Sequence, residues 1–149
     1  MTTRSRPRRT RRGEGLKAVT APGGRVVVVE PARAACVAAA LAAGRPVRIN
    51  GDLHTCAEML SCGLASAPAL QVLLRHGASA VAVSEAQLLA AVAALESGGG
   101  PASTPSGAAG LAGLLHVAVQ PDLREAYGLD EASVVLLVAT EAALEQNPI

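Results

Sequence analysis

Short, uninterrupted runs of apolar residues constrain the fold of this sequence more than any other feature. Val26–Val29 contains four consecutive valines, which is the pattern of a strand buried on both faces of a sheet. The other predicted strands are Pro46–Ile49, Ala80–Val83 and Val134–Ala139. Because helical segments separate these runs, the sequence predicts an α/β domain with a mostly parallel sheet and helices on both faces.

The segments between the strands carry helix signals. Ala32–Ala43 is rich in alanine, and Gly44 follows it as a natural stop. Ser84 and Gln87 have the spacing of a capping box, which predicts a helix start. This helix has Leu88, Leu89, Val92 and Leu95 on its apolar face.

Three further helices are predicted. The first is Thr55–Cys62, which Gly63 ends, and the second is capped by Ser66, ends at Gly77 and has Leu70, Leu73 and Leu74 on its apolar face. The third runs from Thr104-Pro105 to His116 with Leu111, Leu114 and Leu115 facing inward.

Composition excludes several classes of protein. The chain has 149 residues, half of them hydrophobic, which suits one domain with a buried core. Tyr127 is the only aromatic residue, so a base-stacking platform for RNA or single-stranded DNA is excluded. Three cysteines without a signal peptide indicate a reducing compartment, and no apolar run reaches the roughly 18 residues of a membrane span. We therefore expect a cytoplasmic protein.

Residues 1–24 differ from the rest of the chain. Six arginines occur within nine positions, among residues that offer almost nothing apolar. Such a segment is predicted to be disordered, which leaves residues 25–149 as the folded domain. A basic arm for nucleic acid is an alternative to a solvated tail, but no DNA-reading motif follows it.

Three other patterns lack the context that their chemistry needs. His54, Cys56, Cys62 and His76 do not have the paired spacing of a zinc site, so we expect no metal. The sequence Gly13-x-Gly15-x-x-Ala18 resembles a dinucleotide fingerprint, but no strand precedes it. A triad of Ser106, His54 and Asp52 has no supporting motif, and we assign no catalytic residue.

The segment from Thr104 to Gly110 is more informative. It places the Ser106 hydroxyl in the first turn of a predicted helix, after a glycine-rich loop. Helix N-termini favour anions and cofactor heteroatoms, because their backbone N–H groups are free to bind. The alternative is that Ser103, Thr104 and Ser106 only cap the helix.

Four stretches resemble the C-terminal part of the fold-type II pyridoxal-phosphate enzymes, and they occur in the family's order between Arg25 and Glu141. These are VVVVEPARAACVAAALAAGRPVRINGDLHTCAEMLSCG, SAVAVSEAQL, STPSGAAGLAGLL and VVLLVATE. Within this family the stretches resemble diaminopropionate ammonia-lyase more than threonine dehydratase and its relatives. The resemblance implies a partial tryptophan-synthase-β-like fold.

The same resemblance implies pyridoxal phosphate as cofactor and an amino acid as substrate. The implied reaction is β-elimination, which would convert 2,3-diaminopropionate to pyruvate and ammonia. It also implies that Ser106 hydrogen-bonds the pyridine nitrogen of the cofactor and that Gly107 belongs to the same segment.

The sequence departs from the family at several positions. Its only lysine is Lys17, in the context GLKAV rather than the family's S-F-K-x-R-G, and the glycine-rich phosphate loop is missing. Thr104 and Pro105 replace residues that include a glutamate in relatives, and Ala142 replaces the glycine of the family's T-E-G. The isolated chain is therefore predicted to be inactive or only weakly active, since it lacks the Schiff-base lysine.

Two alternatives differ in class from this interpretation. The chain could be a non-catalytic α/β interaction module that pairs with a separate chain carrying the missing half, or with another copy of itself. A basic-tailed nucleic-acid binder is the third interpretation, and it requires residues 1–24.

Overall fold

The computed structural model describes residues 24–142, so nearly all of the predicted tail lies outside the described residues. Strand β1 (Val27–Pro31) pairs with strand β2 (Ser79–Val83) in a parallel sheet of two strands. Val27 lies opposite Ser79 and Pro31 lies opposite Val83. This pairing confirms the predicted parallel α/β arrangement, and β2 agrees closely with the predicted strand Ala80–Val83.

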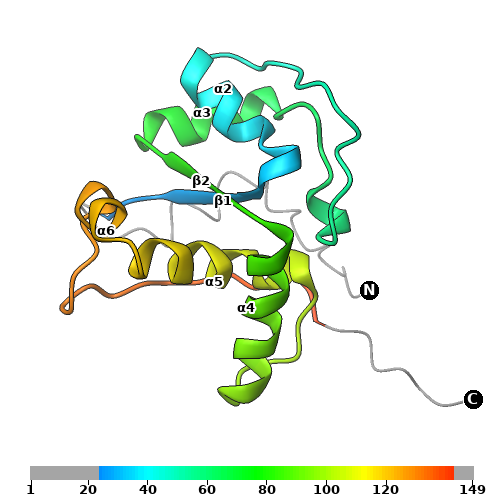
Figure 1. Ribbon diagram of the computed structural model, residues 1–149. Helices are drawn as coiled ribbons and strands as arrows, with labels where there is room; N and C mark the ends of the chain where they lie inside the picture. Colours follow the sequence, from blue (N-terminus) through cyan, green and yellow to red (C-terminus); the bar gives the residue numbers. More distant parts are fainter. Residues whose placement is uncertain (1–23, 143–149) are drawn as a thin grey trace, which may run out of the picture.

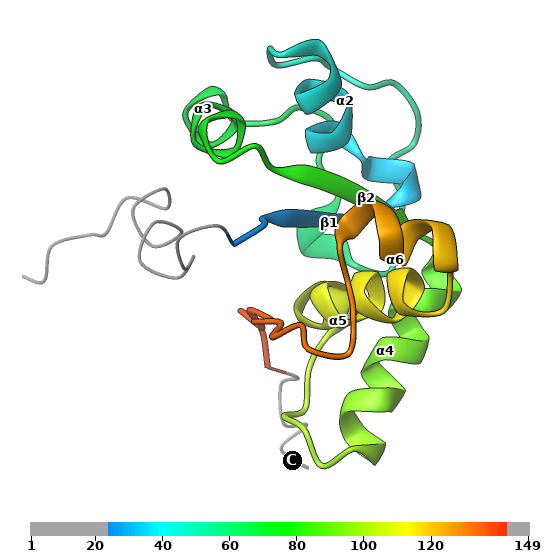
Figure 2. The same ribbon diagram turned by 90° about the vertical axis from the view of Figure 1, so that its left-hand side faces the viewer.

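Helices cover both faces of this sheet (Figures 1 and 2). One face carries α2 (Cys36–Ala43) and α3 (Ala67–Arg75), which form a small core of Cys36, Ala40, Ala65 and Leu70. The opposite face is covered by α5 (Pro105–Ala118), with α4 (Glu85–Ser97) and α6 (Pro121–Tyr127) packed beside it. The second core is built by Ala57, Val83, Leu88, Ala91, Ala108, Ala109 and Ala112.

Strand β1 is buried only towards its end. Glu30 and Pro31 are buried, whereas Val27 is 38% exposed. The prediction of a strand buried on both faces is therefore wrong for its first residues. Within residues 24–142, β2 is the only strand beside β1, so one edge of β1 has no strand to cover it.

The predicted helix Ala32–Ala43 is divided into a 3-10 turn (Ala32–Ala34) and α2. The Glu30 carboxylate accepts the backbone N–H groups of Val37 and Ala38, both at 2.8 Å. This carboxylate caps the first turn of α2, where free N–H groups need an acceptor. Gly44 ends the helix in the left-handed conformation with φ +65°, as predicted.

The predicted helix Thr55–Cys62 is wrong, because only the 3-10 turn Glu58–Leu60 (η2) forms there. Side chains take the N–H groups that a helix would use. The Cys56 N–H donates to the Glu85 carboxylate at 2.7 Å, and the Ala57 N–H donates to the Thr55 hydroxyl at 3.1 Å. Local side-chain acceptors of this kind compete with helical hydrogen bonds.

Two predicted strands are also wrong. Pro46–Ile49 forms only a single antiparallel bridge, between Arg48 and Leu64. Val134–Ala139 belongs to no strand, and residues 134–138 are between 38% and 99% exposed. The orange segment that contains them runs along α5 (Figure 1). Its composition suits a strand, but no strand in residues 24–142 pairs with it.

The helices α3, α4 and α5 confirm their predictions in position but not in every buried residue. Ser84 and Gln87 form the complete capping box at the start of α4. In α5 the buried face consists of small residues and Val117, while Leu115 is 42% exposed. Leu74 and Leu89 are likewise exposed. Helix α6 was not predicted, although Pro121 opens it and Gly128 ends it in the left-handed conformation.

None of the helices described between residues 24 and 142 has the length and apolar character that a membrane crossing requires.

Candidate functional site

The predicted site residues lie at the start of α5, beside the carboxyl ends of the strands. Helix α5 runs back along the sheet, so that its last turn and α6 reach the amino ends of β1 and β2 (Figure 1). Gly113, in the middle of α5, packs against Val29 of β1. The first turn of α5 is therefore at the edge of the sheet where open α/β folds bind their ligands.

Thr104 caps this helix as the sequence predicts. Its hydroxyl oxygen accepts the Gly107 N–H at 3.1 Å, and Pro105 occupies the first helical position. Threonine is a favourable N-cap because it satisfies one of the free N–H groups, and proline has no N–H to satisfy there.

Glu141 and Ala142, at the C-terminal end of the described chain, contact the residues at the start of α5. The Thr104 hydroxyl donates to the Glu141 carboxylate at 2.7 Å, and the Ser103 hydroxyl donates to the Glu141 carbonyl oxygen at 2.9 Å. Ser103 also forms an antiparallel bridge with Ala142. A carboxylate at this position is favourable, since the N-terminal end of a helix carries partial positive charge.

Gly107 is buried where these segments meet. A Cβ atom at this position would lie 2.5 Å from the Glu141 carbonyl oxygen and closer still to the Ser103 hydroxyl. The absence of a side chain at residue 107 therefore permits the close approach of the Glu141 backbone.

Ser106 is half-buried and faces a different segment. Its hydroxyl oxygen accepts the backbone N–H of Met59, in η2, at 3.2 Å. Among the described residues this hydroxyl donates no hydrogen bond, so its proton is available to an added acceptor. Ser106 and Gly107 are thus neighbours in one turn with contacts on opposite sides.

The segment that carries Met59 is fixed by Glu85, the first residue of α4. The Glu85 carboxylate accepts the Cys56 N–H and, at 3.1 Å, the Thr55 hydroxyl. The Cys56 N–H lowers the pKa of Glu85, while burial and the neighbouring carboxylate raise the pKa of the Cys56 thiol to about 11. Ala57 completes the anchor, because it is fully buried against α5 in the larger core.

The four residues considered as zinc ligands, His54, Cys56, Cys62 and His76, lie in different surroundings. His54 is on an exposed loop, Cys62 is exposed, and His76 caps the C-terminal end of α3. Cys56 is held by Glu85 instead. Within residues 24–142, no group of three or more His, Cys, Asp or Glu residues is arranged to hold a metal ion.

One contact near the site was not predicted. The His116 ring on α5 lies against two amide groups, with Gln87 Nε2 2.6 Å and Gln120 Nε2 3.0 Å from its Nδ1 atom. Because amide nitrogens only donate, this Nδ1 atom is the acceptor in the arrangement. The pair of Gln87 and His116, 29 residues apart, couples the capping box of α4 to α5 and has no local sequence signal.

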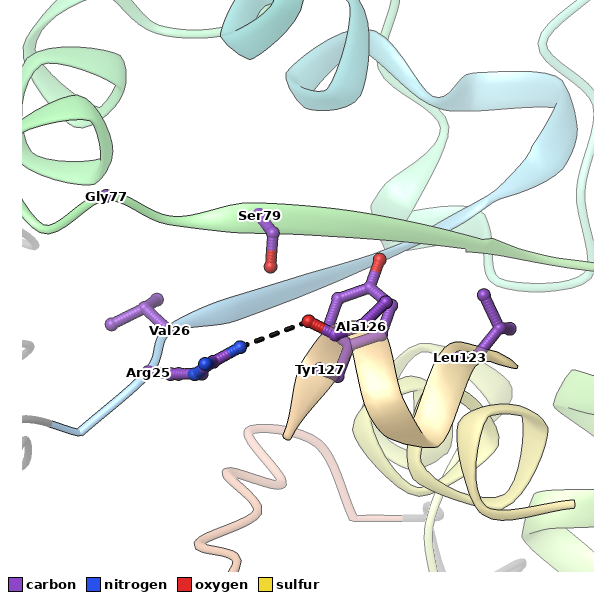
Figure 3. Close-up of a pocket in the computed structure, with 7 residues that line it drawn as sticks. All are labelled: Arg25, Val26, Gly77, Ser79, Leu123, Ala126 and Tyr127. Carbon is purple, nitrogen blue, oxygen red and sulfur yellow. Dashed lines mark hydrogen bonds between the residues drawn. The ribbon is translucent and has the colours of Figure 1, made fainter. Parts of the chain in front are cut away.

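A hollow lies at the opposite, amino end of the sheet (Figure 3). Arg25 lines it and donates from Nη1 to the Ala126 carbonyl at 3.1 Å, while the Tyr127 hydroxyl donates to the Ala80 carbonyl at 2.9 Å. These bonds fix α6 to the strands. Because the Arg25 side chain and the Tyr127 hydroxyl both donate to backbone carbonyl oxygens, we assign the residues of this hollow a structural role.

Comparisons with known proteins agree with this geometry. The family model described as "Pyridoxal-phosphate dependent enzyme" matches residues 13–141. The threonine deaminase of T.th. has a TM-score of 0.64 and 27% identity, over 72% of this chain and 39% of that one. A comparison with curated proteins finds no match.

Two further structures share the fold. The L-serine ammonia-lyase of Rhizomucor miehei has a TM-score of 0.67 and 23% identity, over 80% of this chain and 36% of that one. Maize serine racemase has a TM-score of 0.62 and 24% identity, over 74% of this chain and 34% of that one. The chain therefore spans between 34% and 39% of the length of these three proteins. Because the family match covers most of the sequence, this chain belongs to the pyridoxal-phosphate dependent enzyme family.

Proposed function

We propose that this chain forms one side of the cofactor site of a pyridoxal-phosphate dependent ammonia-lyase. In this proposal the Ser106 hydroxyl donates a hydrogen bond to the pyridine nitrogen. The observation that carries the proposal is the fixed hydroxyl of Ser106, whose oxygen accepts the Met59 N–H and whose proton has no acceptor among the described residues.

The donor fits the acceptor that it would meet. An unprotonated pyridine nitrogen only accepts hydrogen bonds, and a hydroxyl already occupied as an acceptor is left to donate. Gly107 supports the arrangement from the opposite side of the turn, since it lets Glu141 close on α5. We infer that Gly107 shapes the site through this packing.

The residues that the structure describes fit only the pyridine end of the cofactor. A Schiff base requires an amine, and the only lysine of the sequence, Lys17, lies outside residues 24–142. When bound, the cofactor supplies an electron sink for the α-carbon of an amino acid. We propose that the isolated chain is inactive or very weakly active, because no described residue supplies the amine or removes the α-proton.

The substrate that we propose is a small amino acid with a β-leaving group, with 2,3-diaminopropionate as the first compound to test. The resemblance of the PSGAAGLAGLL and VVLLVATE segments to diaminopropionate ammonia-lyase supports this choice. We propose further that a separate polypeptide supplies the lysine and the phosphate-binding loop.

Binding of pyridoxal phosphate tests the proposal. The purified chain is titrated with the cofactor, and its absorbance and fluorescence are recorded for the wild type, Ser106→Ala and Ser97→Ala. Loss of one hydrogen bond costs about 1 kcal/mol, so Ser106→Ala should weaken binding about fivefold. Ser97 is an exposed serine at the end of α4, and its replacement should leave binding unchanged. Equal affinity of the three proteins, or no binding by any, contradicts the proposal.

A further inference from the structure

The hydrogen bond between Met59 and Ser106 joins a short turn to α5 across 47 residues of sequence. Its donor lies in η2, where the Leu60 N–H donates to the Ala57 carbonyl oxygen at 2.8 Å. A single turn of this kind is not stable by itself, because its few hydrogen bonds do not offset the entropy lost in forming it. The position of the Met59 N–H therefore depends on the contacts that hold the neighbouring residues.

A run of hydrogen bonds fixes the segment immediately before η2. One oxygen of Glu85, Oε2, accepts both the Cys56 N–H at 2.7 Å and the Thr55 hydroxyl at 3.1 Å. The Thr55 hydroxyl oxygen in turn accepts the Ala57 N–H at 3.1 Å. Thr55 is 3% exposed and Ala57 is fully buried. Loss of an acceptor here would leave buried donors unsatisfied, which is costly.

The start of α4 holds Glu85 itself in place. Ser84 and Gln87 form the capping box around it, and Leu88 is fully buried in the larger core that also contains Ala57. A carboxylate in the first turn of a helix is also favoured by the partial positive charge at that end. Glu85 is therefore a fixed acceptor, to which the segment before η2 is bound.

We propose that Glu85 is a positioning residue for the cofactor and acts through Met59 on Ser106. This role rests on the proposed function, in which the Ser106 hydroxyl donates to the pyridine nitrogen. The Met59 N–H occupies the hydroxyl oxygen of Ser106, so the hydroxyl proton is directed elsewhere. Glu85 acts through the chain alone: its carboxylate holds Thr55 and Cys56, and these residues hold η2 against the first turn of α5.

The two bonds at Oε2 predict different effects for two substitutions of Glu85. Glu85→Ala removes the acceptor and should release η2. Glu85→Gln keeps a carbonyl oxygen that can accept both donors, and it loses only the charge. Since hydrogen bonds to an ionised acceptor are roughly twice as strong as neutral ones, the glutamine variant should retain part of the effect. If the charge alone mattered, the two variants would behave alike.

Hydrogen exchange of the Met59 amide tests the contact without the cofactor. Its rate is measured by NMR in the full chain and divided by that of Ala108, whose N–H donates to the Thr104 carbonyl oxygen at 2.9 Å. This ratio should rise about tenfold in Glu85→Ala and less in Glu85→Gln, because a hydrogen bond is lost or weakened. Glu96→Ala, at an exposed position of α4, should leave it unchanged. General loss of folding would accelerate both amides, so the ratio distinguishes release of η2 from misfolding.

Cofactor affinity tests the positioning role. Pyridoxal phosphate is titrated into the wild type, Glu85→Ala, Ser106→Ala and the double variant. If Glu85 acts through Ser106, each single substitution should weaken binding about fivefold, and the double variant should bind no more weakly than Ser106→Ala. A residue that only stabilises the fold would act independently of Ser106, and the two effects would multiply to about 25-fold. That result overturns the proposal.

Failure of the contact and failure of the cofactor site give different results. An unchanged exchange ratio in Glu85→Ala overturns the role of Glu85 alone, since Ser106 can donate to the cofactor without it. Unchanged cofactor affinity in Ser106→Ala overturns the proposed function, and the role of Glu85 with it.

Discussion

The hydroxyl of Thr104 donates a 2.7 Å hydrogen bond to the carboxylate of Glu141, 37 residues further along the chain. The same hydroxyl oxygen accepts the N–H of Gly107, so one side chain both caps α5 and holds the distant segment. This relationship determines how the proposed site is closed, because Glu141 and the first turn of α5 support each other.

Thr104→Ala should destabilise the fold by about 1–2 kcal/mol, because α5 loses its N-cap and Glu141 loses its donor. Urea unfolding monitored by circular dichroism measures the change. Thr104→Ser keeps the hydroxyl and should remain within about 0.5 kcal/mol of the wild type. If the alanine variant is as stable as the serine variant, the hydroxyl does not hold this turn.

Replacing glycines of α5 by alanine should have opposite effects at two positions. Alanine normally stabilises a helix by up to about 1 kcal/mol relative to glycine, and Gly110→Ala should follow this rule. Its added Cβ would meet only Leu137, at 3.6 Å. Gly107→Ala should destabilise by about 1–3 kcal/mol, because its Cβ would collide with Ser103 and the Glu141 backbone. Equal unfolding midpoints for the two variants would contradict the close approach.

Glu85 should make stability depend on pH. Its pKa is lowered in the folded state by the Cys56 N–H, so its stabilising effect is present above the ordinary value of 4.5 and is lost as the pH falls through the lower folded value. The difference in unfolding free energy between wild type and Glu85→Gln should therefore shrink on acidification. Glu96→Gln, on the exposed side of α4, is the control. A difference that is constant between pH 7 and pH 3 would show that the charge of Glu85 is not involved, given that carboxylates normally titrate near pH 4.

The exposed segment beside α5 should govern association of the chain. Val134 is 99% exposed and Val138 is 65% exposed, in a stretch of β-branched and aliphatic residues. Val134→Asp with Val138→Asp should reduce aggregation without lowering stability, because charges on such a segment prevent strand pairing between chains. Light scattering against concentration measures the effect. Val83→Asp, at a position 1% exposed, should instead unfold the protein.

Local signals were sufficient for some elements. The capping box of Ser84 and Gln87 predicted α4 because it uses only neighbouring residues, and Thr104 predicted α5 for the same reason. The short apolar run Ala80–Val83 predicted β2, and in the structure its two valines, Val81 and Val83, are buried. Ser106 was placed correctly in the first turn of α5, while its contact with Met59 required the fold.

The wrong predictions depend on groups outside the segment concerned, which either compete for its N–H groups or are needed to pair with it. The Glu85 carboxylate takes the Cys56 N–H that a helix would use, 29 residues away in sequence. Glu30 similarly decides where α2 begins. Val134–Ala139 has the composition of a strand, but a strand also needs a neighbour, and residues 24–142 provide none for it. No periodicity in the sequence contains this information.

Turnover by the isolated chain tests the central claim most directly. The purified protein is incubated with pyridoxal phosphate and 2,3-diaminopropionate, and release of ammonia and pyruvate is compared with the cofactor alone and with Lys17→Arg. The account predicts that all three rates agree, since the contacts that we propose for residues 24–142 are with the pyridine side of the cofactor and these residues include no lysine. Repeated turnover by the wild type above the rate of the free cofactor would contradict it.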